Sequence, residues 1–163
     1  MERITEQEIR RSMVNCSRGE ASNMTLPKDL DLLDWKSREF LGWRDAKAPL
    51  RGYIVQRRDG KPVGIALRAA DSAMSRRRSA MCLLCRTVHP ADTISMFTAK
   101  LTGPLGRNGN SVGTYICADL ACSQNIRTKK PGVPQPDQGL AIEERSAGLH
   151  SRLSAFIDDV LRV

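Results

Sequence analysis

The chain has 163 residues, with 26 Lys and Arg against 18 Asp and Glu, so its formal net charge is +8. This length allows one medium domain with a real core, and a hydrophobic content of 40% is ordinary for a globular protein. No apolar run approaches the roughly 20 residues that span a bilayer, and the N-terminus lacks the apolar segment of a secretory signal. The composition predicts a cytoplasmic protein without membrane contact. Its partner should be acidic, either nucleic acid or a protein surface.

Residues 1–33 predict an N-terminal helical segment. Thr5 and Glu8 have the spacing of a capping box, in which Thr5 is the N-cap residue. Apolar residues come after it at helical spacing, so an amphipathic helix is expected from about Glu6 to about Asn15. Gly19 and the polar residues after it are expected to break this helix.

A second short helical turn is predicted over residues 27–34, and it leads into a group of three aromatic residues. Only 4% of the chain is aromatic, so these side chains are scarce. We interpret Trp35, Phe40 and Trp43 as one local core rather than a recognition surface. They open a mixed α/β domain that is expected to cover residues 34–130.

The clearest strand signal surrounds Asp59 and Gly60. The flanking segments, residues 53–58 and 63–67, alternate as strands do, and Asp-Gly accepts the positive φ angles of a tight hairpin turn. Alternate apolar residues of the second strand would share one buried face. Gly64 leaves the opposite face shallow, which predicts close approach of another layer.

Four of the five cysteines form two close pairs, with residues 86–116 between them. The pairs are Cys82 with Cys85 and Cys117 with Cys122. A C-x2-C turn lets two thiolates take two corners of a zinc tetrahedron. Asp119 as N-cap would place Cys122 in the first turn of a helix, where free N–H groups favour thiolates. Disulfides or buried thiols are the alternative, but thiols stay reduced in a cytoplasmic protein. Knuckle, hairpin and helix start together predict a treble-clef finger over residues 79–130, holding one structural zinc ion.

Two further residues with metal-binding chemistry lie outside this set. Cys16 is the odd cysteine and is interpreted as a helix-face thiol with no role. His89 lies four residues after Cys85 and is either a neighbour of the ligands or a substitute ligand. Direct ligation by His89 is not expected, because four cysteines already complete a tetrahedron.

The regions around the knuckle carry basic residues. For Arg76–Arg78 two interpretations stay open, a solvated approach to the zinc site or a contact to phosphate or carboxylate groups. Residues 94–101 and 112–116 alternate as strands do, and the glycine-containing tip at 102–110 joins them. Such a tip is a natural contact loop, and Arg107 gives it charge.

The C-terminal part is expected to be a separate unit. The helix after the second cysteine pair should end at Lys130, because Pro131 cannot continue it. Residues 131–139 predict a proline-rich linker, which should make the C-terminal segment separable from the finger. An apolar stripe at helical spacing predicts a helix within residues 140–163 that packs on the body or on a second copy. Its charges do not form the basic face of a membrane-binding helix.

Several of these motifs occur together between residues 41 and 130. They are Leu41 to Asp45, a hairpin with Tyr53, Gly60 and Gly64, the knuckle Met81 to Cys85, Ser95 to Lys100, and Gly113 to Cys122. This stretch resembles the zinc-finger domain of the elongation factor G-binding protein family, which includes the fusidic-acid-resistance proteins. The C-x4-C pair preceded by Tyr-Ile is the most specific match.

The resemblance implies a non-enzymatic protein with a treble-clef finger on a small mixed α/β domain. It also implies binding of elongation factor G on or off the ribosome. In the resistance members, binding drives the factor off ribosomes stalled by fusidic acid. The four zinc ligands of the family carry over onto the four paired cysteines, Cys82, Cys85, Cys117 and Cys122.

The expected fold class is therefore α+β, with small antiparallel hairpins, a four-cysteine treble-clef finger, and flanking N- and C-terminal helices. The expected function is binding of elongation factor G and modulation of its release from the ribosome. The alternative is a zinc-finger protein that binds RNA or the ribosome. No catalytic constellation and no small-molecule substrate are expected, because the sequence has no P-loop and no G-x-G-x-x-G motif.

Chemistry alone suggests which groups of the finger contact an acidic partner. They are Phe97, Lys100, Arg107, Tyr115, Lys129 and Lys130. Elongation factor G is acidic as a class, so a basic face on the finger suits it. For Phe97 and Tyr115 the alternative is that they pack the hairpin against the helix.

Overall fold

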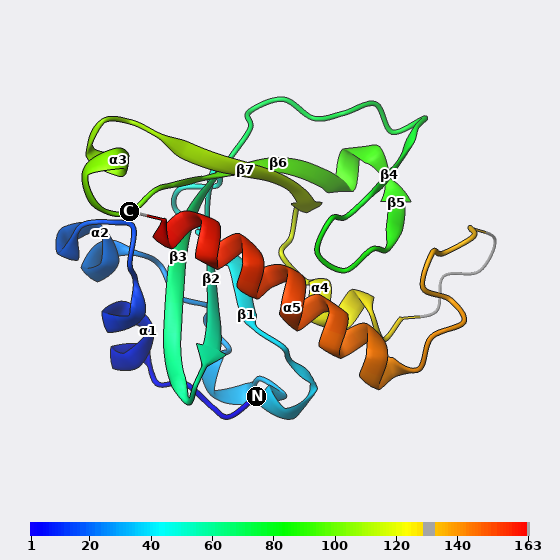
Figure 1. Cartoon of the computed structure of the whole chain (residues 1–163), viewed down its shortest axis with the longest axis horizontal. Coiled ribbons are helices and arrows are strands. Elements are labelled where there is room, and N and C mark those ends of the chain that lie inside the picture. The colour runs from blue at the N-terminus through cyan, green and yellow to red at the C-terminus, as the bar shows by residue number, and fades with distance from the viewer. Residues whose placement is uncertain (129–132, 163) are drawn as a thin grey trace.

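The protein is seen in a computed structural model that describes residues 1–128 and 133–162. A five-stranded antiparallel sheet in the order β1-β2-β3-β6-β7 forms its centre (Figure 1). The strands are β1 (Leu41–Arg44), β2 (Arg51–Arg58), β3 (Lys61–Ala69), β6 (Ile94–Lys100) and β7 (Ser111–Cys117). A separate ribbon pairs β4 (Ser79–Met81) with β5 (Val88–Pro90).

Helices flank both faces of this sheet. They are α1 (Glu6–Ser12), α2 (Arg18–Asn23), α3 (Gly103–Arg107), α4 (Cys122–Asn125) and α5 (Ile142–Leu161), with 3-10 turns at Leu30–Leu32, Trp35–Ser37 and Ala91–Thr93. The long helix α5 crosses one face of the sheet, and the short α1 and α2 lie at its other side (Figure 1). Within the described residues, no helix is both long enough and apolar enough to cross a membrane. The α+β fold class is confirmed.

The hairpin predicted around Asp59 and Gly60 is present. Strands β2 and β3 pair in register from Arg51 opposite Arg68 to Arg58 opposite Lys61. At the turn, Asp59 and Gly60 have φ angles of 49° and 76°, as a tight hairpin of right-handed twist requires.

The shallow face at Gly64 receives another layer, as predicted. The chain leaving α1 crosses β3 here, and the Val14 N–H donates to the Gly64 carbonyl oxygen at 2.9 Å. A Cβ atom at position 64 would lie 2.6 Å from the Met13 Sδ and 2.6 Å from the Ser12 Oγ. Only glycine therefore allows α1 to approach the sheet this closely.

The capping box at Thr5 is confirmed, but the helix it starts is shorter than expected and a second one comes after it. The Glu8 N–H donates to Thr5 Oγ1 and the Thr5 N–H to Glu8 Oε2. The sequence then starts helix α2 at Ser17, through an equivalent box with Glu20. Gly19 was expected to break the first helix, but that helix already ends at Ser12. Gly19 instead lies in the first turn of α2, where a strong cap offsets its low helix propensity.

Two hydrophobic cores lie on the two faces of the sheet. The first packs α5 and the cysteine cluster against one face, and includes Phe40, Ile54, Ile65, Leu67, Phe97, Ala99 and Ile116. The second packs the N-terminal segments against the other face, and includes Ile4, Ile9, Met24, Trp35, Leu41, Trp43, Tyr53 and Val55. The three aromatics expected to form one local core are divided, because Phe40 belongs to the first core.

Helix α5 is an integral part of the first core, which corrects the expectation of a separable C-terminal unit. Its five fully or nearly buried apolar residues are Leu149, Leu153, Phe156, Ile157 and Val160. The buried Gln56 of β2 extends this contact, since its Nε2 donates to the His150 carbonyl at 3.1 Å and its Oε1 accepts from Ser154 Oγ at 3.2 Å. The apolar stripe thus packs on the body of the protein, which was one of the two expected partners.

The loop between β6 and β7 and the helix after Cys122 differ in detail from expectation. The tip at residues 102–110 contains the short helix α3, which gives part of the expected flexible loop regular structure. Helix α4 ends at Asn125, and the chain continues in turns as far as Thr128. The expected helix end at Lys130 lies outside the described residues.

Candidate metal centre

The first cysteine pair is held in the turn between β4 and β5. The Cys82 N–H donates to the Thr87 carbonyl at 3.1 Å, and the Arg86 N–H donates to the Cys82 carbonyl at 2.9 Å. Arg86 has a φ angle of 55°, a left-handed conformation that is uncommon for a residue with a side chain. The turn therefore folds back sharply, and both thiols of the knuckle point to the same side.

The second pair comes from the end of β7 and the start of α4. Cys117 is the last residue of the strand, and Cys122 is the first residue of the helix. Asp119 is not the N-cap residue, which is Ala121, but its Oδ1 accepts a hydrogen bond from the Ala121 N–H at 3.0 Å. Asp119 thus shapes the turn before the helix rather than capping the helix itself.

The four thiols converge on one point. Their sulfur atoms all lie within 4.8 Å of one another, and all four residues are buried. Cys82 Sγ is 3.7 Å from Cys122 Sγ, and Cys85 Sγ is 3.6 Å from Cys117 Sγ. Four sulfurs at about 2.3 Å from a central zinc are about 3.8 Å apart in a tetrahedron, so these distances suit the ion.

The same distances exclude the disulfide alternative. A disulfide bond needs about 2.05 Å between two sulfur atoms, and these sulfurs are farther apart. All four cysteines are free thiols. The donor set is therefore four sulfurs in a closed, buried site, which is the pattern of structural rather than catalytic zinc.

Polar groups around the cluster donate to its sulfurs. The Asn125 Nδ2 donates to Cys117 Sγ at 3.2 Å, and the Cys85 N–H donates to Cys82 Sγ at 3.4 Å. His89 Nε2 lies 3.7 Å from Cys117 Sγ, so the histidine neighbours a ligand. Such partners orient thiolates and lower their charge density. Sequence reasoning missed Asn125, which no spacing rule would have selected.

The thiols of the two pairs lie close enough to share protons. Hydrogen bonds from the Cys117 thiol and then the Cys122 thiol lower the pKa of both Cys82 and Cys85. The pKa of Cys122 is raised by its hydrogen bonds to Cys117 and then to Cys82. A zinc ion binds thiolates, so its binding releases protons from the cluster, and metal affinity must rise with pH.

The knuckle is fixed to the sheet and to α5 by backbone contacts. The Leu83 N–H donates to the Tyr115 carbonyl at 2.9 Å, which joins the knuckle to β7. The Arg152 Nε donates to the Leu84 carbonyl at 2.6 Å, which joins it to α5. The zinc site therefore ties three parts of the chain that are far apart in sequence.

The residues expected to contact a partner fall into three groups. Lys100 and Arg107 are exposed, and Tyr115 is 45% exposed. Phe97 is fully buried in the first core, so the expectation that it forms part of the surface was wrong. It points to the opposite face from Thr98 and Lys100, because side chains alternate along β6. Lys129 and Lys130 lie outside the described residues.

The finger also exposes an apolar residue that sequence reasoning overlooked. Leu83 is 48% exposed although it lies between two buried metal ligands. The signal was present, since the two middle residues of a C-x2-C knuckle cannot both turn inward. Its neighbour Leu84 is the one that packs into the core.

Comparison with known proteins gives a family match that is longer than the stretch that carries the finger motifs. The family model described as the FBP C-terminal treble-clef zinc-finger matches residues 8–160. No curated protein matches the chain. Among solved structures it is similar to the fusidic acid resistance protein FusC, with 27% sequence identity and a TM-score of 0.48. That alignment covers 63% of this chain and 46% of FusC, so the chain spans less than half the length of that protein.

The extent of the family match agrees with the packing. The resemblance visible in the sequence ended at Lys130, whereas the family domain includes the segment that forms α5. Four buried thiols at tetrahedral spacing fit one structural zinc ion. The chain belongs to the FBP C-terminal treble-clef zinc-finger family.

Proposed function

We propose that the protein binds elongation factor G through the surface beside its zinc centre and modulates release of the factor from the ribosome. It acts by binding alone, without catalysis. Support comes from the family membership and from the resemblance of its finger motifs to the elongation factor G-binding proteins. A net charge of +8 suits an acidic partner.

The observation that carries the proposal is a pair of exposed apolar residues fixed by the metal centre. Leu83 and Tyr115 are 48% and 45% exposed, and a backbone hydrogen bond joins the two residues. Each is within two positions of a zinc ligand, so the ion limits their motion. Preorganised aromatic and aliphatic groups are the usual anchors of protein interfaces.

The sheet around this pair is uncovered. The second core places the N-terminal segments over β1, β2 and β3, whereas Thr98, Lys100 and Ser111 of β6 and β7 are partly or fully exposed on the same face. Register pairs Lys100 with Ser111 and Met96 with Tyr115. An apolar anchor with basic residues along the same strands has the composition expected of a surface for an acidic protein.

The test is surface plasmon resonance of the full zinc-loaded chain on purified elongation factor G. Tyr115→Ala should raise the dissociation rate by about tenfold or more, because a central anchor is lost. Reversing Lys100 and Arg107 to Glu together should mainly slow association, because complementary charge acts on encounter. Lys61→Glu, an exposed lysine at the far end of β3, is the matched control and should change little.

Zinc content and melting temperature must equal those of the wild-type protein in each variant. Absence of binding by a folded, zinc-loaded wild-type chain would refute the proposal. So would equal effects of Lys61→Glu and of Lys100→Glu made alone, since these variants change the net charge equally and that result would reflect net charge alone.

One observation favours the alternative function, an RNA- or ribosome-binding finger. Arg76, Arg77 and Arg78 are all exposed beside β4, and the Arg76 Nε is 3.9 Å from a carboxylate oxygen of Asp92. If they grip RNA phosphates, affinity for rRNA fragments should fall linearly with log salt, with a slope set by the phosphates neutralised. Tight, salt-sensitive RNA binding without factor binding would favour this function.

A further inference from the structure

A pocket opens where two strands of the central sheet part. Strands β3 and β6 pair only at Arg68 with Thr98 and at Ala69 with Phe97. Beyond these pairs the side chain of the buried Asn15 bridges the strands. Its Nδ2 donates to the carbonyls of Ala66 and Lys100, both at 3.0 Å, and its Oδ1 accepts from the Ala66 N–H at 2.7 Å. These three hydrogen bonds fix the Asn15 side chain at the border of the pocket.

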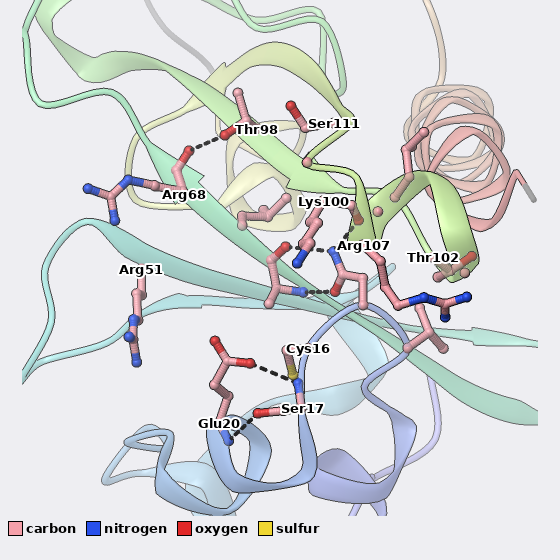
Figure 2. Close-up of a pocket in the computed structure, with 18 of the residues that line it drawn as sticks. Cys16, Ser17, Glu20, Arg51, Arg68, Thr98, Lys100, Thr102, Arg107 and Ser111 are labelled. Carbon is pink, nitrogen blue, oxygen red and sulfur yellow. Dashed lines mark hydrogen bonds between the residues drawn. The ribbon is translucent and has the colours of Figure 1, made fainter.

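The cavity has a volume of about 570 Å³, within the range of small-molecule sites. It is bordered by β2, β3, β6, the α3 segment and the residues leading into α2. Figure 2 shows Arg51 and Arg68 on one side of it, Arg107 on the opposite side, and Lys100 between them. Four cationic side chains from four different elements therefore surround one pocket.

These cations oppose one another electrostatically. Arg51 and Arg68 are direct partners in the β2–β3 register, and like charges at opposed positions destabilise a sheet. Among the described residues no carboxylate forms an ion pair with Arg51, Arg68 or Lys100. An anion bound between these two arginines would neutralise their repulsion.

One carboxylate borders the pocket and is already engaged. Glu20 accepts the Ser17 N–H at 2.8 Å as part of the α2 capping box (Figure 2). Hydrogen bonds from Ser17 chiefly lower its pKa, and the charges of Arg51 and Lys100 lower it further. Glu20 stays ionised but is held at the helix start, so among the described residues one fixed negative charge borders the pocket together with four positive ones.

We propose that this pocket binds a small anion that bears two or more phosphate groups. Guanidinium groups bind phosphate through paired N–H donors, and the clustered charge of a diphosphate matches several cations around one pocket better than a single carboxylate does. The Ser111 hydroxyl borders the same pocket and can donate to a phosphate oxygen, whereas the Thr98 hydroxyl donates to the Arg68 carbonyl at 3.4 Å. The site adds a ligand where the sequence predicted no small-molecule substrate, and it does not depend on factor binding.

Two other ligand classes fit the pocket less well. An extended acidic peptide gains affinity by pairing with a free strand edge, but edge groups beside the pocket are already bonded. The Val14 N–H donates to the Gly64 carbonyl, and the Asn15 side chain bonds to the backbone of Ala66 and Lys100. A single-stranded nucleic acid needs aromatic platforms, and the one aromatic ring that borders the pocket, Tyr53, is buried.

Isothermal titration of the zinc-loaded full chain with inorganic pyrophosphate and tripolyphosphate tests the proposal. Saturable binding is expected, and Arg68→Gln should weaken it by about tenfold or more. Glu20→Gln should strengthen it, because glutamine preserves a capping box but removes the opposing charge. Arg77→Gln removes an exposed arginine that does not border the pocket and should leave affinity unchanged.

Thermal melting separates a binding role from a structural one. Since Arg68 faces Arg51, Arg68→Gln should leave the melting temperature without ligand unchanged or raise it, while the rise caused by pyrophosphate should be lost. The proposal is overturned by absence of saturable binding, or by equal losses in Arg68→Gln and Arg77→Gln. Tighter binding of a glutamate octapeptide or of single-stranded RNA than of tripolyphosphate, lost in Arg68→Gln, would assign the site to that class instead.

Discussion

The two sides of the central sheet are stabilised by different means. On one side, a metal cluster and a 20-residue helix close a core that includes every buried cysteine. On the other, helices of seven and six residues and two 3-10 turns close a core of aromatic and aliphatic side chains. Isolated helices this short are unstable in water, so those of the second side depend on the sheet beneath them.

The difference shows that the two regions are stabilised by different interactions. The metal fixes loops that have little regular structure of their own, and the exposed residues between its ligands become rigid. The N-terminal side uses ordinary packing and covers only part of its face, which leaves β6 and β7 open. Loss of zinc and loss of N-terminal packing should therefore have unequal and separable effects.

The largest effect is expected from the metal ligands. Cys82→Ser and Cys117→Ser should abolish stoichiometric zinc and open the finger, because structural zinc contributes on the order of 10 kcal/mol of folding free energy. Elemental analysis and limited proteolysis measure the two consequences. Hydrogen exchange should rise first in β4, β5 and α4, and later in β2 and β3.

Cys16→Ser is the matched control, because Cys16 is remote in sequence from the cluster and is not one of its four thiols. It should keep one zinc per chain and an unchanged melting temperature. A Cys82→Ser protein that also kept its zinc and its melting temperature would contradict the assignment.

The next largest effect concerns α5. Ile157 is fully buried in the first core, so Ile157→Ala should lower the free energy of unfolding by about 2–5 kcal/mol. Truncation after Pro136 removes five such residues and should yield insoluble or largely unfolded protein. Urea denaturation measures the first variant, and solubility with bound zinc measures the second. A soluble, zinc-loaded and cooperatively melting truncation would show that the linker does separate two units.

Much of this first side was visible in the sequence, because its signals are local. The cysteine spacings, the turn at Asp59 and Gly60, and the apolar stripe of α5 each involve residues close together in the chain. The sequence could not show which surface of the sheet these elements pack against. Phe97 has the pattern of an exposed strand residue as well as a buried one, and only the position of α5 and the cluster decides between the two.

Hydrogen bonds between residues far apart in the sequence could not be predicted either. Asn15 bonds to backbone groups of Ala66 and Lys100, and Gln56 bonds to His150. Nothing adjacent to these polar residues marks them as buried. The second capping box at Ser17 did have a local signal, and it was overlooked because Gly19 lies just after it.

The next effect in size concerns the buried carboxylate of Glu39. Its carboxylate accepts from Arg127 at 2.7 and 2.9 Å and from Ser146 Oγ at 2.6 Å, which joins the chain before β1 to the end of the finger and to α5. Burial opposes its ionisation, but the hydrogen bonds from Arg127 and Ser146 outweigh burial and lower its pKa below the usual 4.5.

Glu39→Gln should cost about 2 kcal/mol at neutral pH, less than a fully buried ion pair because Arg127 is partly exposed. A lowered folded-state pKa contributes stability above the unfolded value, and that stability is lost as pH falls through the folded value. The wild-type and variant unfolding free energies should therefore begin to converge as the pH falls below the unfolded value of about 4.3, and should meet below the folded value. Urea midpoints at several pH values measure this, and a constant difference would contradict the ionised link.

The smallest effect is expected at the N-terminal caps. Thr5→Ala removes the hydroxyl that accepts the Glu8 N–H at 3.3 Å and should cost about 1 kcal/mol. Ser17→Ala removes the equivalent acceptor for Glu20 in α2, so its cost should be similar. Differential scanning calorimetry measures both changes. Zinc content and hydrogen exchange in β4, β5 and α4 should stay at wild-type values, because these caps touch only the second core. If Thr5→Ala instead raised hydrogen exchange in the finger as much as loss of a cysteine ligand does, the two sides of the sheet would unfold as one cooperative unit. The metal would then not stabilise the finger separately.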